Sequence, residues 1–223
     1  MEEGELLKNN LMQYLPQFIG LATIALLGAM SPGADFVLVT RNSLVHSRKI
    51  GIFTAIGIGL GVLVHVFYTL AGIGLIISKS ILLFNLIKYV GAIYLIYLGL
   101  KSISAKPQFH KNEIEKESDK AKNISPAKAM LSGIATNALN PKVTLFFLSL
   151  FMQFISTGTP FLIQVLLGLE VAFVIGSWFV IVAMLFSNDA LKSKIKKIGH
   201  WLERLTGAAL ILLGIKVALS TRE

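Results

Sequence analysis

The sequence predicts an all-α polytopic membrane protein, with six transmembrane helices arranged as two inverted three-helix repeats. The first observation is composition: 54% of the 223 residues are hydrophobic, and the mean hydropathy is +0.72. The second is pattern, because the apolar residues fall into blocks near the ~20 residues that cross a bilayer, with the charges between them. The third is that a polar residue followed by proline interrupts one block in each half of the chain.

Six apolar blocks define the expected transmembrane helices. They lie at 16–40, 51–77, 81–101, 129–155, 160–186 and 200–219. Residues 1–101 form the first repeat, residues 102–128 form a polar cytoplasmic loop in which Lys alternates with Glu and Asp, and residues 129–223 form the second repeat. Because three crossings is an odd number, the second repeat is expected to lie inverted in the membrane.

Two correspondences between the halves are the basis for the repeat. The run Ser31-Pro32 corresponds to Asn140-Pro141. The separation between the two prolines and the separation between Lys101 and Lys216 agree to within a loop-sized insertion, so the two halves are expected to share one fold. The second correspondence joins three residues near the end of each half: Gly91, Gly99 and Lys101 with Gly207, Gly214 and Lys216.

Each of the two polar-proline runs is expected to break its helix near the middle of the membrane. Ser31 and Asn140 are predicted to be N-caps, with the proline that follows each at the first helical position. The restarted half-helices then place the positive ends of their dipoles at that depth. A charged residue follows each break, Asp35 in one and Lys142 in the other. Because charge inside a membrane span is costly, both indicate function.

The residues of the two breaks are the candidate site for a substrate or a coupling ion. An amino-acid zwitterion needs two opposite charges a few ångströms apart. Lys142 and two helix N-termini offer positive charge to a carboxylate, and Asp35 can accept an ammonium or a proton. A structural Asp35–Lys142 ion pair that joins the repeats stays open as an alternative. The full predicted set is Ser31, Pro32, Gly33, Asp35, Asn137, Asn140, Pro141 and Lys142.

Two further ionisable residues lie within spans and are candidates for a proton relay. His65 lies in the second span and Glu170 in the fifth. Histidine titrates near neutral pH, which suits proton transfer. The alternative for His65 is a hydrogen bond to a neighbouring carbonyl group.

Glycines in the second span predict close helix packing. Gly57 and Gly61 form a small-xxx-small pair, which lets two helices approach closely. A phosphate-binding loop is excluded, because no strand precedes the glycines and no Lys-Ser/Thr follows them. The glycine faces permit packing within one subunit or between subunits, so a homo-oligomer stays open.

The net charge of +9 is expected to set the orientation in the membrane rather than to bind nucleic acid. Cytoplasmic loops are rich in Lys and Arg. Most of these residues lie in 41–49, 101–128 and 192–197, which fall on one side of the membrane. Both termini are therefore predicted to lie outside the cell (inner) membrane. The chain has no cysteine, which excludes disulfides and thiolate metal sites.

Three stretches resemble signatures of the lysine-exporter (LysE/RhtB) superfamily. Gly28 to Asn42 is similar to its first-span signature, Gly91 to Gly99 to its third, and Asn137 to Phe147 to its fourth. One departure is Ala34, where the family often has a second proline. The resemblance covers nearly the whole chain. It implies export of amino acids or their derivatives from the cytoplasm, driven by the proton gradient.

The sequence therefore predicts a secondary transporter that exports amino acids or amino-acid derivatives by proton antiport and alternating access around a midplane site. Its expected partners are the substrate, protons and the lipid bilayer, with no cofactor and no nucleic acid. One alternative is an exporter of metal or other small ions, for which Asp35, Glu170 and His65 are the available ligands in the spans. A membrane-embedded enzyme is less favoured, because Ser177 has no histidine at membrane depth in the second half to act as its base.

Overall fold

The computed structural model describes residues 2–31, 33–79, 81–104, 124–155, 158–187 and 189–219, and within these ranges its regular structure is entirely helical. The helices are α1 (Glu2–Met30), α2 (Ala34–Val45), α3 (Arg48–Lys79), α4 (Ile81–Ile103), α6 (Pro126–Ala138), α7 (Pro141–Phe154), α8 (Phe161–Phe186) and α9 (Asp189–Leu219).

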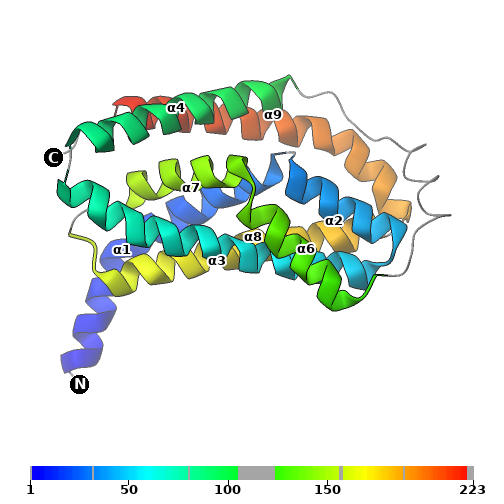
Figure 1. Ribbon diagram of the computed structural model, residues 1–223, viewed down its shortest axis with the longest axis horizontal. Coiled ribbons are helices and arrows are strands. Elements are labelled where there is room, and N and C mark those ends of the chain that lie inside the picture. The colour runs from blue at the N-terminus through cyan, green and yellow to red at the C-terminus, as the bar shows by residue number, and fades with distance from the viewer. Residues whose placement is uncertain are drawn as a thin grey trace.

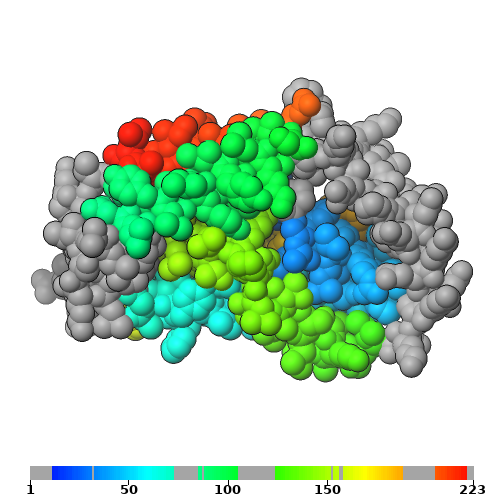
Figure 2. Space-filling model, turned by 45° about the horizontal axis from the view of Figure 1, so that its top comes forward, coloured from blue at the N-terminus to red at the C-terminus, as the bar shows by residue number. Residues whose placement is uncertain are grey.

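The helices run roughly along the long axis of the molecule (Figure 1). Helix α4 packs mainly against α9, and α3 packs mainly against α6 and α8. The chain passes from α1 to α2, and from α6 to α7, near the middle of the long axis (Figure 1). Figure 2 shows that α7 and α2 reach the surface on one face, with α4 on one side of them and α6 on the other.

The exposed surface of these helices is that of a membrane protein. Three described segments are long and apolar enough to cross a membrane, namely Met12–Met30, Arg48–Gly72 and Phe161–Phe186, and Pro141–Phe151 is a shorter apolar helix. Large apolar side chains point outward from them: Phe67 is 76% exposed and Phe173 is 73% exposed. Extensive exposed apolar surface is unfavourable in water but is expected against lipid.

Most helix ends agree with the predicted blocks, but the starts of α1 and α9 do not, because α1 begins at Glu2 and not near residue 16. Helix α9 begins at Asp189, not near residue 200. The lysines at 192–197, which the sequence placed in a connector, therefore lie in the first turns of this helix. Hydropathy finds the apolar part of a helix, whereas Lys and Leu are good helix formers that extend it beyond the membrane.

Glycines hold α3 against α6. A Cβ added at Gly57 would lie 2.1 Å from the carbonyl oxygen of Met130, and one at Gly61 would lie 2.8 Å from the Cβ of Asn137. On the α6 side, a Cβ at Gly133 would lie 2.3 Å from the carbonyl oxygen of Thr54. The two backbones are therefore in direct contact, and the predicted packing role of the glycines in α3 is confirmed.

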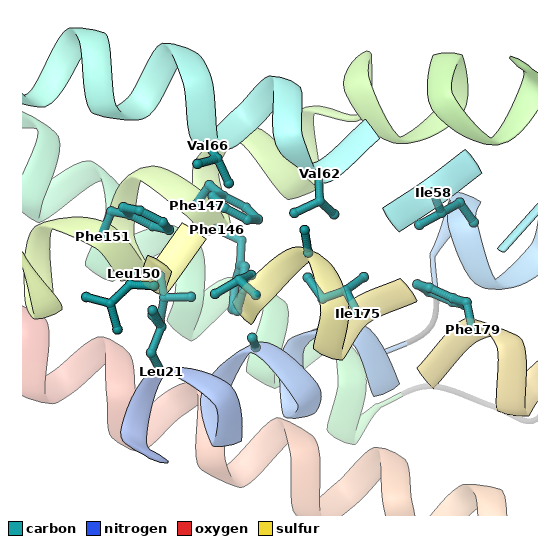
Figure 3. Packing of buried hydrophobic residues seen from close by; sticks show 14 of the residues in the cluster. Leu21, Ile58, Val62, Val66, Phe146, Phe147, Leu150, Phe151, Ile175 and Phe179 are labelled. Carbon is teal, nitrogen blue, oxygen red and sulfur yellow. The ribbon is translucent and has the colours of Figure 1, made fainter. Parts of the chain in front are cut away.

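An aromatic core fixes α7 inside the protein. Phe147 and Phe151 are fully buried, and their rings stack with centroids 5.4 Å apart. Figure 3 shows these two rings between Val66 of α3 and Leu21 of α1. Because α7 is held in this way, the residues at its start have a fixed position near the middle of the molecule.

Candidate functional site

The passage from α6 to α7 is built by capping. Helix α6 ends at Ala138, and Asn140 has extended backbone and is the N-cap of α7. The side-chain oxygen of Asn140 accepts a hydrogen bond of 3.0 Å from the N–H of Lys142. Pro141 occupies the first turn, where its missing N–H costs little. The predicted cap at Asn140 is therefore confirmed.

The passage from α1 to α2 is built differently. Helix α1 ends at Met30, and the N-cap of α2 is Gly33, which makes no side-chain cap. The prediction that Ser31 is the N-cap is wrong, because the helix restarts two residues later and the N–H of Ser31 still donates to the carbonyl of Gly28. Pro32 lies outside the described residues. Asp35 lies in the first turn of α2, where the helix dipole favours a negative charge.

A cavity of about 40 Å³ lies between the two passages. The polar part of its lining consists of six of the eight residues predicted for substrate or ion binding: Ser31, Gly33, Asp35, Asn137, Asn140 and Lys142. The structure thus brings together two stretches more than a hundred residues apart in the sequence. The remaining lining is apolar and comes from α1, α2, α7 and α8: Gly28, Ala29, Phe36, Val143, Phe146, Ile175 and Phe179.

Asp35 is buried and only half satisfied. Its side chain is 7% exposed, and Asn137, from the other half of the chain, donates a 2.8 Å hydrogen bond to Oδ2. The other carboxyl oxygen, Oδ1, has no hydrogen-bond partner among the described residues, and neither has the side-chain oxygen of Asn137. Buried polar atoms are nearly always hydrogen-bonded, so two unpartnered acceptors at one cavity are notable.

Lys142 also reaches across to the other half of the chain. Its Nζ donates a 2.8 Å hydrogen bond to the carbonyl oxygen of Ser31. That carbonyl directly follows the end of α1, so the ammonium lies at the negative end of the α1 dipole. The start of the α7 dipole repels a cation, whereas the end of the α1 dipole attracts it. Asp35 accepts from, and Lys142 donates to, a group in the other half of the chain.

His65 extends the polar network from the cavity into α3. Its Nε2 lies 2.9 Å from the carbonyl oxygen of Asn137, and its Nδ1 lies 2.5 Å from the hydroxyl of Tyr68. The ring is fully buried and stacks on Phe147 with centroids 5.5 Å apart. Because a carbonyl only accepts, Nε2 carries a proton, and in the neutral ring Nδ1 accepts from Tyr68. The carbonyl hydrogen bond considered for His65 is thus present.

Two other predicted residues do not line the cavity. Pro141 is exposed, and Glu170 lies nearer the start of α8 than the cavity residues Ile175 and Phe179. The carboxyl oxygen Oε2 of Glu170 is buried without a hydrogen-bond partner in the part of the chain that the structure describes. Within that part, no group of three His, Cys, Asp or Glu residues lies close enough to hold a metal ion. The described residues therefore offer no ligand cluster that would support the alternative of a metal exporter.

Sequence reasoning did not predict the apolar lining or Tyr68. Phe146, Ile175 and Phe179 lie in long apolar blocks, where nothing separates a cavity residue from a core residue. Tyr68 did carry a signal, because it follows His65 by three residues, and residues at that spacing share one helix face.

The fold and the cavity together indicate the class of protein to which this chain belongs. The chain is a helical membrane protein with apolar outer surfaces and a cavity with a polar and an apolar side, where the passage from α1 to α2 meets the passage from α6 to α7. A family model, that of the LysE type translocators, matches residues 26–221. The chain belongs to this family of transport proteins, which confirms the resemblance found in the three signatures.

Curated relatives match along nearly their whole length. The chain is 31% identical to the uncharacterized membrane protein YrhP of Bacillus subtilis, over 95% of this chain and 100% of that protein. It is 28% identical to the threonine efflux protein of Escherichia coli K12, covering 91% and 98% of the two chains. It is 31% identical to the leucine efflux protein of Klebsiella pneumoniae, covering 94% and 95%. No solved structure matches the chain.

Proposed function

We propose that this protein is a secondary transporter that exports amino acids from the cytoplasm, with the cavity as its substrate site. One observation carries the proposal: a carboxylate, Asp35, and an ammonium, Lys142, line the same small buried cavity. This pair of opposite charges is complementary to the α-ammonium and α-carboxylate of an amino acid. Relatives named threonine and leucine efflux proteins support the same substrate class.

Inverted three-helix repeats, each with one interrupted span, are the architecture that we propose for this transport. Reciprocal contacts between antiparallel helices support it. A Cβ at Gly99 of α4 would lie 2.5 Å from the carbonyl oxygen of Gly207 of α9, and one at Gly207 would lie 2.6 Å from that of Gly99. Gly59 of α3 and Gly176 of α8 face one another in the same way. These contacts favour a correspondence of Gly99 with Gly207, in place of the correspondence of Gly99 with Gly214 that the sequence predicts.

Alternating access is the mechanism that we propose, and the size of the cavity supports it. Ligand pockets typically have roughly 300–1,000 Å³, whereas this cavity has about 40 Å³. The cavity described here is therefore too small to hold a typical ligand, and we propose that substrate enters when the helices around the two passages move apart. Secondary transporters with discontinuous helices commonly work by such movement around a fixed midplane site.

The orientation that we propose places both termini outside the cell membrane. Helix α1 begins, and α9 ends, at one end of the long axis (Figure 1). Basic residues cluster toward the opposite end, among them Arg48 and Lys49 at the start of α3 and Lys101 at the end of α4. Cytoplasmic ends of spans are the Lys- and Arg-rich ones. A topology reporter fused after Glu223 should therefore be active outside the cytoplasm, and cytoplasmic activity would contradict this orientation.

Proton antiport is the coupling that we propose, with Asp35 as the proton acceptor and His65 as the relay. Asp35 has one carboxyl oxygen without a hydrogen-bond partner among the described residues. Asn137 connects it to His65, because its side chain bonds Asp35 and its carbonyl oxygen contacts the imidazole. Glu170 is a second relay candidate, but it lies outside this network and has less support.

Transport in proteoliposomes tests the proposal. Purified protein should accumulate labelled amino acid when a pH gradient is imposed, and a protonophore should abolish the accumulation. Asp35→Asn and Lys142→Gln should each lower transport at least tenfold. Lys128→Gln, which removes a charge from the exposed first turn of α6, is the matched control and should transport normally. Normal transport by both cavity variants would refute the assignment of this site.

A further inference from the structure

The cavity has a polar side and an apolar side. Asp35, Asn137 and Lys142 lie on the polar side, where α2, α6 and α7 begin or end. Phe146 of α7 and Ile175 and Phe179 of α8 supply large, buried apolar side chains of the lining, and Phe36 of α2 adds a half-buried one. In Figure 3, Ile175 is drawn between Phe146 and Phe179, and Phe179 lies farther along α8. A bound amino acid that pairs its charges with the polar side is left with its side chain against this apolar side.

The three side chains on the apolar side form a wall that packing holds in place. Phe146, Ile175 and Phe179 are at most 5% exposed and belong to the main apolar core. The ring of Phe146 sits directly against Gly28, where an added Cβ would lie 2.5 Å from its Cζ. Ile175 and Phe179 are four residues apart on α8 and so lie on the same face of that helix. The wall is therefore held by three helices and is not free to turn away from a substrate.

The α-ammonium and α-carboxylate of one amino acid are enough to pair with the two charges of the lining. Among the described lining residues, Asp35 is the one carboxylate and Lys142 the one ammonium. A second charge on the substrate would have to lie against the aromatic and aliphatic wall, where burial of an unpaired charge is very costly. A hydroxyl on a substrate side chain that points at Phe146, Ile175 and Phe179 would find no hydrogen-bond partner in these three side chains.

We propose that Phe146, Ile175 and Phe179 form the side-chain subsite of this cavity and select neutral amino acids with branched aliphatic side chains. This inference rests on the proposed amino-acid transport and specifies its substrate class. Valine should be preferred to threonine, which has the same shape but carries a hydroxyl in place of a methyl group. An apolar pocket discriminates between such isosteres by about 10–100-fold. Lysine should not be transported at a measurable rate.

Competition between labelled valine, threonine and lysine in proteoliposomes tests the subsite. Phe179→Tyr adds a hydroxyl to the wall with little change of volume, and Ile175→Thr adds one while it shortens the side chain. Each should lower the valine-to-threonine ratio several-fold, because threonine gains a hydrogen-bond partner. Phe173→Tyr makes the same change on the exposed face of α8 and should leave the ratio unaltered. Because the ratio is measured on one preparation, it does not depend on the amount of folded protein.

The outcomes separate the subsite from the proposed function. Transport of valine with a ratio that falls in either wall variant, but not in the control, supports the subsite. If threonine or lysine is preferred by the unaltered protein, or if neither wall variant changes the ratio, the subsite is overturned while amino-acid transport stands. Absence of flux for all three amino acids overturns the proposed function itself. If Phe179→Tyr fails to fold, Ile175→Thr decides the result.

Discussion

Substitution of Gly57 by alanine is the sharpest test of the contact between α3 and α6. The new Cβ would lie 2.1 Å from the carbonyl oxygen of Met130, which is more than an ångström closer than ordinary contact allows. The atom that it meets is backbone, so no side chain can rotate to relieve the clash. The two helices must therefore separate, and overpacking of this kind costs about 1–3 kcal/mol.

Gly72 provides the matched control, because it lies on the same helix and an added Cβ there meets nothing within 4 Å. Alanine is a better helix former than glycine by about 1 kcal/mol. Gly72→Ala should therefore leave stability unchanged or slightly raised, whereas Gly57→Ala should lower it.

Reversible unfolding in mixed micelles, followed by far-UV circular dichroism, measures both changes. Separation of α3 from α6 should also lengthen the 2.9 Å contact between His65 and the carbonyl of Asn137, so transport should fall with stability. Equal stability of Gly57→Ala and Gly72→Ala would refute the packing of these two helices.

Three further predictions concern the cavity. Asn140→Ala removes the cap of α7, so it should destabilise the protein by about 1 kcal/mol and impair transport. Ser125→Ala removes the cap of α6, which lies far from the cavity, and should leave transport intact. Unfolding and flux assays measure both variants. Asn137→Leu leaves the buried Oδ2 of Asp35 without its donor, which should cost about 1–3 kcal/mol and abolish transport, and an unchanged unfolding midpoint would contradict this. His65→Gln keeps a donor for the carbonyl of Asn137 but cannot carry a proton, so exchange of substrate without a gradient should persist while proton-driven accumulation is lost; loss of both would assign His65 a structural role.

Local chemistry explains why some features of this protein could be predicted from its sequence. Asn140 followed by proline is a cap signal that depends only on neighbouring residues, and the structure has that cap. The charges at Asp35 and Lys142 were conspicuous because they lie in apolar blocks, and both line the cavity. Gly57 and Gly61 were predicted to lie at a helix contact, because small residues at that spacing have few other uses in a span.

Features that depend on tertiary contacts could not be predicted in this way. Ser31 has a good cap sequence, yet its carbonyl oxygen accepts from Lys142 and the helix restarts at Ala34. Nothing near Ser31 in the chain signals that contact, because Lys142 is more than a hundred residues away. The same holds for Ile175 and Phe179, whose place at the cavity depends on how α8 packs.

The hydrogen bonds across the cavity suggest how substrate binding and opening are linked in the proposed transport. Asn137 donates to Asp35, and Lys142 donates to Ser31, so each half of the chain bonds the other at the cavity. Moving the halves apart to admit substrate breaks both bonds, so that Asp35 and the half-buried Lys142 lose these partners. The α-ammonium of an amino acid replaces the donor that Asp35 loses, and its α-carboxylate replaces the acceptor that Lys142 loses. We therefore expect substrate to favour the open state, because an amino acid supplies both missing partners at once.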